Sequence, residues 1–141
     1  MRFKKILAGI DFSPPSREAM RTAAELAAES GAELTVAHFW QVPLLGAELP
    51  MPAQYIEDIR TATEQQLDAW TAEATELAGK RATNVFGMGA PWDELVKLVR
   101  RDGYDLIVVG THGRTGLKHV LLGSVAEKVV RYAPCAVLVV R

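Results

Sequence analysis

The sequence predicts an α/β domain in which helices cover both faces of a parallel sheet. Its 141 residues match the commonest size of one domain, so we expect a single domain over residues 1–141. Short apolar runs alternate along the chain with longer segments whose apolar residues recur at helical spacing. The first run lacks regular polar–apolar alternation, which is typical of strands buried on both faces. This order of segments predicts parallel strands joined by right-handed crossovers.

The first half of the chain is expected to form two strands and two helices. Residues 5–10 and 33–39 are short apolar runs and are predicted to be strands. Ser13 can cap the helix between them, with Pro14 at the first helical position, where a missing N–H costs nothing. Residues 53–78 repeat apolar positions every three or four residues, which predicts a long helix.

The second half continues the same alternation and ends on a strand. A weaker third strand is predicted over residues 83–88, followed by a helix over residues 92–101. Residues 106–109 form the strongest buried strand of the chain. A helix over residues 124–132 and a last strand over residues 136–140 complete a β-α-β-α-β-α-β-α-β order.

The segment over residues 40–52 is predicted to be a loop, because it contains three prolines and no hydrophobic period. It is unusually apolar for a loop. A loop of this kind typically folds over another part of the protein or covers a partner surface.

Composition excludes several classes of function. The 16 basic and 17 acidic residues give a formal net charge of −1, which does not favour a nucleic-acid partner. The apolar runs are far shorter than the about 20 residues that a membrane helix needs. Asp11 interrupts the apolar run near the N-terminus, which argues against a signal peptide. We therefore expect a cytoplasmic protein with no membrane association.

Several single residues favour structural roles. Cys135 is the one cysteine, so no intrachain disulfide can form, and its apolar surroundings predict a buried thiol. Trp70 and Trp92 are predicted to pack in the core. His112 and His119 lack the neighbouring ligands that a zinc site needs. We expect His119 to lie on a loop surface.

The segment over residues 110–124 carries the strongest functional signal. It follows the predicted fourth strand, contains four glycines and runs into the predicted helix at Ser124. Glycine lets the backbone approach an anion, and a helix N-terminus offers free N–H groups and a positive dipole. A flexible connector is the alternative interpretation. The position at a strand's carboxyl end favours an anion site.

This segment differs from two common phosphate-binding motifs. A Walker loop has a lysine directly before its Ser or Thr, whereas here Ser124 directly follows Gly123. The dinucleotide fingerprint follows the first strand, where this chain lacks a glycine-rich loop.

The sequence resembles the universal stress proteins that carry a glycine signature. In that signature Gly-x-x-Gly is followed, after nine residues, by Gly-Ser, and here these are Gly110, Gly113, Gly123 and Ser124. The resemblance covers essentially the whole chain. It includes the segments over residues 4–7, 11–13, 105–114, 122–126 and 133–140.

The resemblance implies a Rossmann-like, open, parallel five-stranded sheet of order 3-2-1-4-5, with helices on both faces. It also implies ATP, or another adenine nucleotide, with Mg in the crevice between strands one and four. The implied base contacts are Gly9, Ile10 and Phe39, and the implied ribose contacts are Val109 and Gly110. The implied phosphate contacts are Gly113, Arg114, Gly123, Ser124 and Val125.

Two of these residues have alternative interpretations. Asp11 occupies the position of an acidic residue that, in the family, lies near the adenosine or its metal-bridged phosphates. It could therefore meet Mg through phosphate. Alternatively, Asp11 could simply cap the turn, as aspartate often does. Phe39 is bulkier than the valine usual in the family, so it could stack on adenine or narrow the pocket. We expect His112 to contact phosphate or ribose. Lys118 has no assigned role. Ala136 stands where many members have proline.

Three functions follow from this pattern. The first is an adenine-nucleotide-binding regulatory protein of the stress response, with the nucleotide held by residues 110–124. The second is a slow ATP hydrolase or phosphotransferase, for which Asp11, His112 and Arg114 are candidates but no clear general base or metal pair is present. The third is a dimeric scaffold that binds no nucleotide.

The apolar last strand, residues 136–140, suggests a homodimer through the sheet edge, whichever of the three functions holds.

Overall fold

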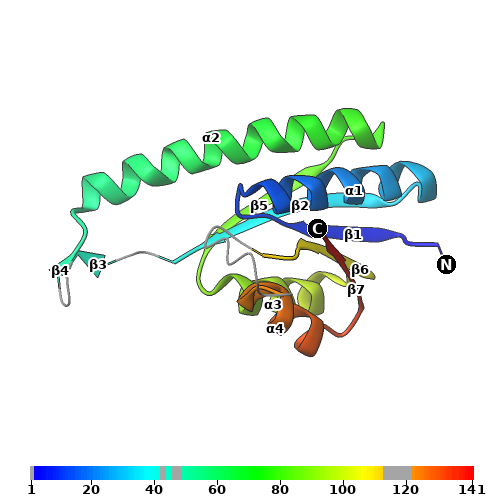
Figure 1. Cartoon of the computed structure of the whole chain (residues 1–141). Coiled ribbons are helices and arrows are strands. Elements are labelled where there is room, and N and C mark those ends of the chain that lie inside the picture. Colours follow the sequence, from blue (N-terminus) through cyan, green and yellow to red (C-terminus); the bar gives the residue numbers. More distant parts are fainter. Residues whose placement is uncertain (1, 42–43, 46–48, 113–121) are drawn as a thin grey trace.

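A computed structural model gives the fold, shown in Figure 1. The structure describes residues 2–41, 44–45, 49–112 and 122–141. The main sheet contains β1 (Lys5–Gly9), β2 (Glu33–Trp40), β5 (Thr83–Met88), β6 (Leu106–Gly110) and β7 (Ala136–Val140). The helices are α1 (Pro14–Ser30), α2 (Ala53–Ala78), α3 (Pro91–Asp102) and α4 (Ser124–Tyr132). These elements agree with the predicted ones to within one or two residues at each end.

All neighbouring strands of the main sheet are parallel, in the order β5-β2-β1-β6-β7. In chain order these strands are numbers 3, 2, 1, 4 and 5, so the expected sheet order is confirmed. The first strand pairs with β2 on one side and with β6 on the other. The chain therefore changes its direction of progress across the sheet between β1 and β6, which is where ligands bind in open α/β sheets.

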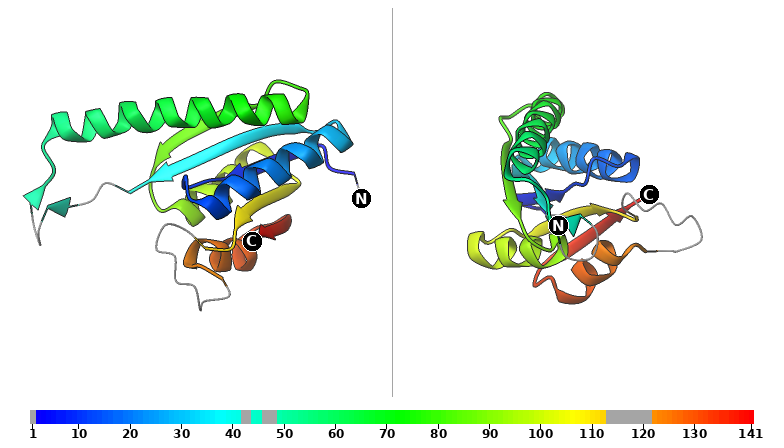
Figure 2. Two further views of the ribbon diagram at one scale, coloured as in Figure 1. Left: turned by 45° about the horizontal axis from the view of Figure 1, so that its top comes forward. Right: turned by 90° about the vertical axis from the view of Figure 1, so that its left-hand side faces the viewer.

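The helices form one layer on each face of the sheet. Figure 2 shows α1 and α2 on one face and α3 and α4 on the other. Each face has its own apolar core because successive strand residues point to opposite faces. Ile6 and Val108 belong to the core under α1 and α2, whereas Leu7 and Ile107 belong to the core over α3 and α4. Burial on both faces explains why these strands lack polar–apolar alternation.

The first helix begins as predicted. Ser13 is its N-cap, and the Ser13 hydroxyl accepts a hydrogen bond from the backbone N–H of Ser16 at 3.3 Å. Pro14 and Pro15 occupy the first two helical positions. Since proline has no N–H, these two residues leave the first turn with two fewer backbone donors than usual.

The apolar segment between β2 and α2, predicted to be a loop, contains a short pair of strands in its described residues. Residues Leu44–Leu45 (β3) pair antiparallel with Leu49–Pro50 (β4), so the interpretation of this segment as loop alone is wrong in part. The hydrophobic pattern did not indicate strands because each has two residues. Leu67 is the first fully buried residue of α2, and the preceding turns project beyond the sheet toward the β3–β4 pair (Figure 1).

The two tryptophans differ in burial. Trp70 is 8% exposed in the core beneath α2, as predicted. Trp92 is only partly buried, and its ring lies 5.2 Å from the Tyr132 ring between centroids. The prediction that Trp92 packs in the core is therefore confirmed only in part. It sits in the first turn of α3, at the margin of the core between the sheet and α3–α4.

The thiol of Cys135 is half-buried rather than fully buried. Partial burial is the main cause that raises the pKa of the Cys135 thiol, and the negative charge of Asp105 raises it further. A raised pKa lowers the thiolate fraction at neutral pH, which opposes a reactive role for this side chain.

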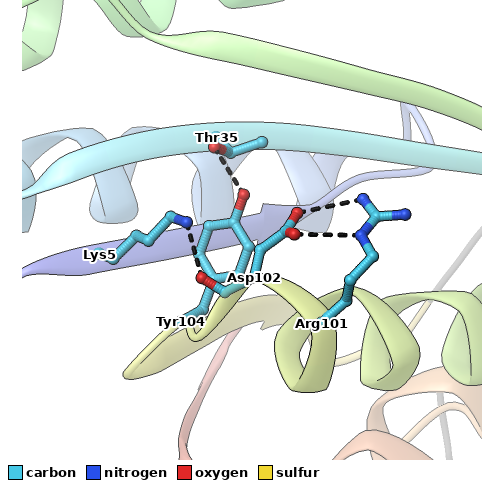
Figure 3. A network of polar contacts seen from close by, with 5 residues as sticks. All are labelled: Lys5, Thr35, Arg101, Asp102 and Tyr104. Atoms are coloured by element: carbon cyan, nitrogen blue, oxygen red, sulfur yellow. Dashed lines mark hydrogen bonds and ion pairs between the residues drawn. The ribbon is translucent and has the colours of Figure 1, made fainter.

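Polar contacts link residues at the amino ends of neighbouring strands (Figure 3). The Tyr104 hydroxyl donates to the Thr35 hydroxyl at 2.9 Å, and the Lys5 ammonium donates to the Asp102 carbonyl at 2.7 Å. The Asp105 carboxylate accepts the backbone N–H groups of Lys4 and Lys5. Each of these polar groups therefore already has a hydrogen-bond partner.

No helix in the described part of the chain is long and apolar enough to cross a membrane.

Candidate functional site

A cleft of about 210 Å³ lies at the carboxyl ends of β1 and β6. Residues that end strands form its floor, and residues from the starts of α1, α3 and α4 form its rim. The lining consists of Gly9, Ile10, Asp11, Ser16, Ala37, Phe39, Pro91, Leu95, Val109, Gly110, His112, Gly123, Ser124, Val125 and Ala126. The walls are mostly apolar, and the polar side chains come from the start of α1 and the turn before it (Asp11, Ser16) and from the segments that follow β6 and begin α4 (His112, Ser124). Such a cleft suits a ligand with an apolar ring at one end and polar groups at the other.

The close approach of helices to the floor depends on two glycines. A Cβ on Gly9 would lie 2.8 Å from the Leu95 side chain of α3. A Cβ on Gly110 would lie 2.8 Å from the Pro15 carbonyl carbon and 2.9 Å from the Ser16 nitrogen. The contact at Gly110 is with helix backbone, which cannot move aside as a flexible side chain can. Glycine at position 110 therefore lets α1 begin directly against β6.

The helix that begins at Ser124 is best suited to an anion. The first turn of α1 carries two prolines, and Ser13 already accepts the Ser16 N–H. The first turn of α3 carries a proline and two carboxylates, Asp93 and Glu94, which repel an anion. Gly123 likewise caps α4 without a side-chain hydrogen bond, but the single carboxylate in the first turn of α4, Glu127, forms an ion pair with Arg131. The helix dipole and the first N–H groups of α4 are therefore directed at this rim of the cleft.

Backbone hydrogen bonds hold the start of α4 beside the end of β6. The Thr111 N–H donates to the Val140 carbonyl at 2.8 Å, and the Thr111 carbonyl accepts the Gly123 N–H. His112 follows and lines the cleft. Its Nδ1 atom is buried and has no hydrogen-bond partner within the described residues. A buried polar atom of this kind is suited to a ligand group.

Asp11 caps the turn after β1, which is one of the two interpretations that the sequence left open. Its carboxylate accepts hydrogen bonds from the Ser13 N–H at 3.0 Å and from the Ser13 hydroxyl, so it caps the turn. It also lines the cleft. The preceding residue, Ile10, is held by two bonds: its N–H donates to the Ala37 carbonyl at 2.9 Å, and its carbonyl lies 2.8 Å from His38 Nδ1. The turn is thus firmly fixed to β2.

The structure brings nearly all of the predicted site residues to this one cleft. Gly113 and Arg114 lie outside the described residues, as do Lys118 and His119. The prediction missed Ser16, Ala37, Pro91, Leu95 and Ala126. Ala37 could have been found from strand periodicity, because it shares a strand face with Phe39. No sequence pattern indicated that Leu95 lines the cleft, because its position there depends on how α3 packs against β1.

Comparison with known proteins identifies the family. The model of the universal stress protein family matches residues 2–141. The chain belongs to this family. It is 33% identical to the universal stress protein YxiE of Bacillus subtilis, over 99% of each chain. The universal stress protein UspA of Lactobacillus plantarum has the same fold, with a TM-score of 0.86, 22% identity, and coverage of 100% of this chain and 99% of that one.

A third relative was solved with a ligand. It is a universal stress protein in complex with cAMP, with a TM-score of 0.67 and 28% identity. The match covers 100% of this chain and 98% of the relative. The resemblance on which the sequence interpretation depended is therefore confirmed at the level of the family and the fold.

Proposed function

We propose that this protein binds an adenine nucleotide, ATP with Mg, and acts as a regulatory protein in the stress response. The observation that carries the proposal is the uncapped N-terminus of α4 at the rim of an apolar cleft. The apolar walls suit a base, and the helix N-terminus suits phosphate. The relative solved with cAMP supports a ligand of this class.

Each part of the nucleotide would meet a distinct part of the cleft. Gly9, Ile10 and Phe39 would line the base, and Val109 with Gly110 would face the ribose. Gly123, Ser124 and Val125 would hold the phosphates, together with Gly113 and Arg114. Asp11 would face Mg through the phosphates. The buried Nδ1 of His112 would contact phosphate or ribose, which would give this orphaned atom a partner.

We favour binding over hydrolysis. A general base for hydrolysis must be free to accept a proton from water. The Asp11 carboxylate accepts two hydrogen bonds from Ser13, both on Oδ1, which fix it in the turn and leave only Oδ2 to take up a proton. Turnover above background that is lost in Gly113→Ala would contradict this choice and favour a slow hydrolase.

Titration calorimetry with ATP and Mg tests the proposal. We expect micromolar binding to the wild-type protein and its loss in the Gly123→Val, Ser124→Ala double variant, because the variant fills the approach to α4 and removes a hydroxyl donor. Parallel titrations with AMP and cAMP measure the contribution of the terminal phosphates. A folded wild-type protein that binds none of the three would contradict the proposal and favour a scaffold.

We also propose a homodimer through β7. This strand is an edge of the main sheet, paired only with β6, and Val137, Leu138, Val139 and Val140 are incompletely buried. An apolar edge is an aggregation hazard unless it is covered, and a second copy would cover it. Light scattering is expected to give twice the mass of the chain at micromolar concentration. A monomer mass there would contradict the proposal.

A further inference from the structure

Phe39 lies across a glycine of the neighbouring strand. The two residues are directly opposite in the register of β2 and β5, Phe39 to Gly87. A Cβ on Gly87 would lie 2.7 Å from Phe39 Cε1 and 2.9 Å from Cδ1. The ring therefore occupies the space that a side chain at position 87 would need.

The same ring forms part of the cleft wall. Phe39 is 8% exposed and lines the cleft together with Ala37, which shares its strand face. β5 is the outer strand of the sheet, and β1, which forms the cleft floor, lies on the other side of β2. A ring displaced from Gly87 would thus move away from β5 and toward the cleft.

We propose that Gly87 is a positioning residue for the base-binding part of the cleft. Glycine at position 87 lets the Phe39 ring lie back over β5, which leaves space for a planar base and turns the ring into its wall. This inference rests on the proposed nucleotide binding and extends it. With its ring over Gly87, Phe39 does not narrow the pocket that its size would otherwise obstruct, because glycine in a strand permits close approach by another group.

A purely structural role is the competing explanation. An aromatic ring over a glycine at a sheet edge stabilises the sheet by itself. The two explanations differ in what a Cβ at position 87 does. If the pair only stabilises the sheet, Gly87→Ala changes the free energy of unfolding and leaves nucleotide affinity unchanged. If Gly87 positions the ring, affinity falls, and removal of the ring relieves the loss.

The test is a double-mutant cycle read by ATP affinity. We expect Gly87→Ala to weaken ATP binding by on the order of tenfold, a size typical of coupling between residues in contact. In the Phe39→Val background the same substitution is expected to have no effect, because valine leaves room for the added methyl group. Gly87→Ala that has no effect in the wild-type background, or an equal effect in both backgrounds, would overturn the inference.

Gly79→Ala is the matched control for loss of stability. Gly79 ends α2 with a φ of +66°, and a Cβ there meets no atom within 4 Å. This variant introduces backbone strain far from Phe39, so it is expected to lower the free energy of unfolding without changing ATP affinity. If Gly79→Ala weakened binding as much as Gly87→Ala, the effect would come from stability, and the inference would fail.

A measurement on the wild-type protein does not depend on whether Gly87→Ala folds. We expect nuclear Overhauser contacts between the Phe39 ring protons, assigned by their loss in Phe39→Val, and the protons of bound adenine. Their absence in a saturated complex would overturn the inference and leave nucleotide binding intact. Absence of ATP binding by the wild-type protein would overturn both the inference and the proposed function.

Discussion

Replacement of Gly110 with alanine is expected to lower the free energy of unfolding by about 1–3 kcal/mol, the usual cost of overpacking, and to abolish nucleotide binding. The new Cβ would lie within 3.0 Å of three atoms of Pro15 and Ser16, two of them backbone. The first turn of α1 would have to shift away from β6. Since Gly110 and Ser16 both line the cleft, this shift would distort the site directly. Urea unfolding and calorimetry with ATP measure the two effects.

Gly103→Ala separates the two effects. Gly103 precedes the same strand, but its φ is +75° and a Cβ there meets no atom within 4 Å. Alanine in this left-handed conformation costs roughly 1–2 kcal/mol, so the stability loss is similar. The cleft lies at the other end of β6, and ATP affinity is expected to stay at the wild-type value. Normal ATP affinity in Gly110→Ala would show that the start of α1 does not shape the site.

The succession of elements was predictable because each is long enough to show its own period. The Ile107 strand is apolar without alternation, and the Leu67–Trp70–Ala74 stripe recurs at helical spacing. The β3–β4 pair was missed because two residues cannot show a period of two. Trp92 was placed in the core because an apolar residue at a helix start has the same pattern whether or not another helix covers it fully.

The site was predictable only as far as strand ends and glycines indicate it. The resemblance to the universal stress proteins implied that Gly9 and Val109 line one crevice, which agrees with the shared carboxyl edge of parallel strands. Which helix can bind phosphate depends on capping, and here Ser13 and the two prolines remove α1 as a candidate. The contact between Phe39 and Gly87 depends on strand register, which the local pattern of either strand does not contain.

Replacement of Ser124 with proline is expected to weaken ATP binding far more than replacement with alanine. Ser124 is the first residue of α4, where proline fits a helix, and Gly123 has φ −70° and ψ 168°, a conformation that a following proline favours. The variant therefore keeps the helix and its dipole but removes one N–H. A hydrogen bond to a charged group contributes roughly 1.5–3 kcal/mol, so the loss is expected to be about 10- to 100-fold.

Ser124→Ala is the matched control, because it removes the hydroxyl and keeps the N–H. Since both variants lack the hydroxyl, the difference in ATP affinity between them reports the loss of the backbone donor together with the added proline ring. Circular dichroism and thermal unfolding should show that the proline variant is at least as stable as the wild-type protein. If both variants bound ATP equally, the N–H of Ser124 would not contact phosphate, and the role proposed for this backbone donor would be wrong.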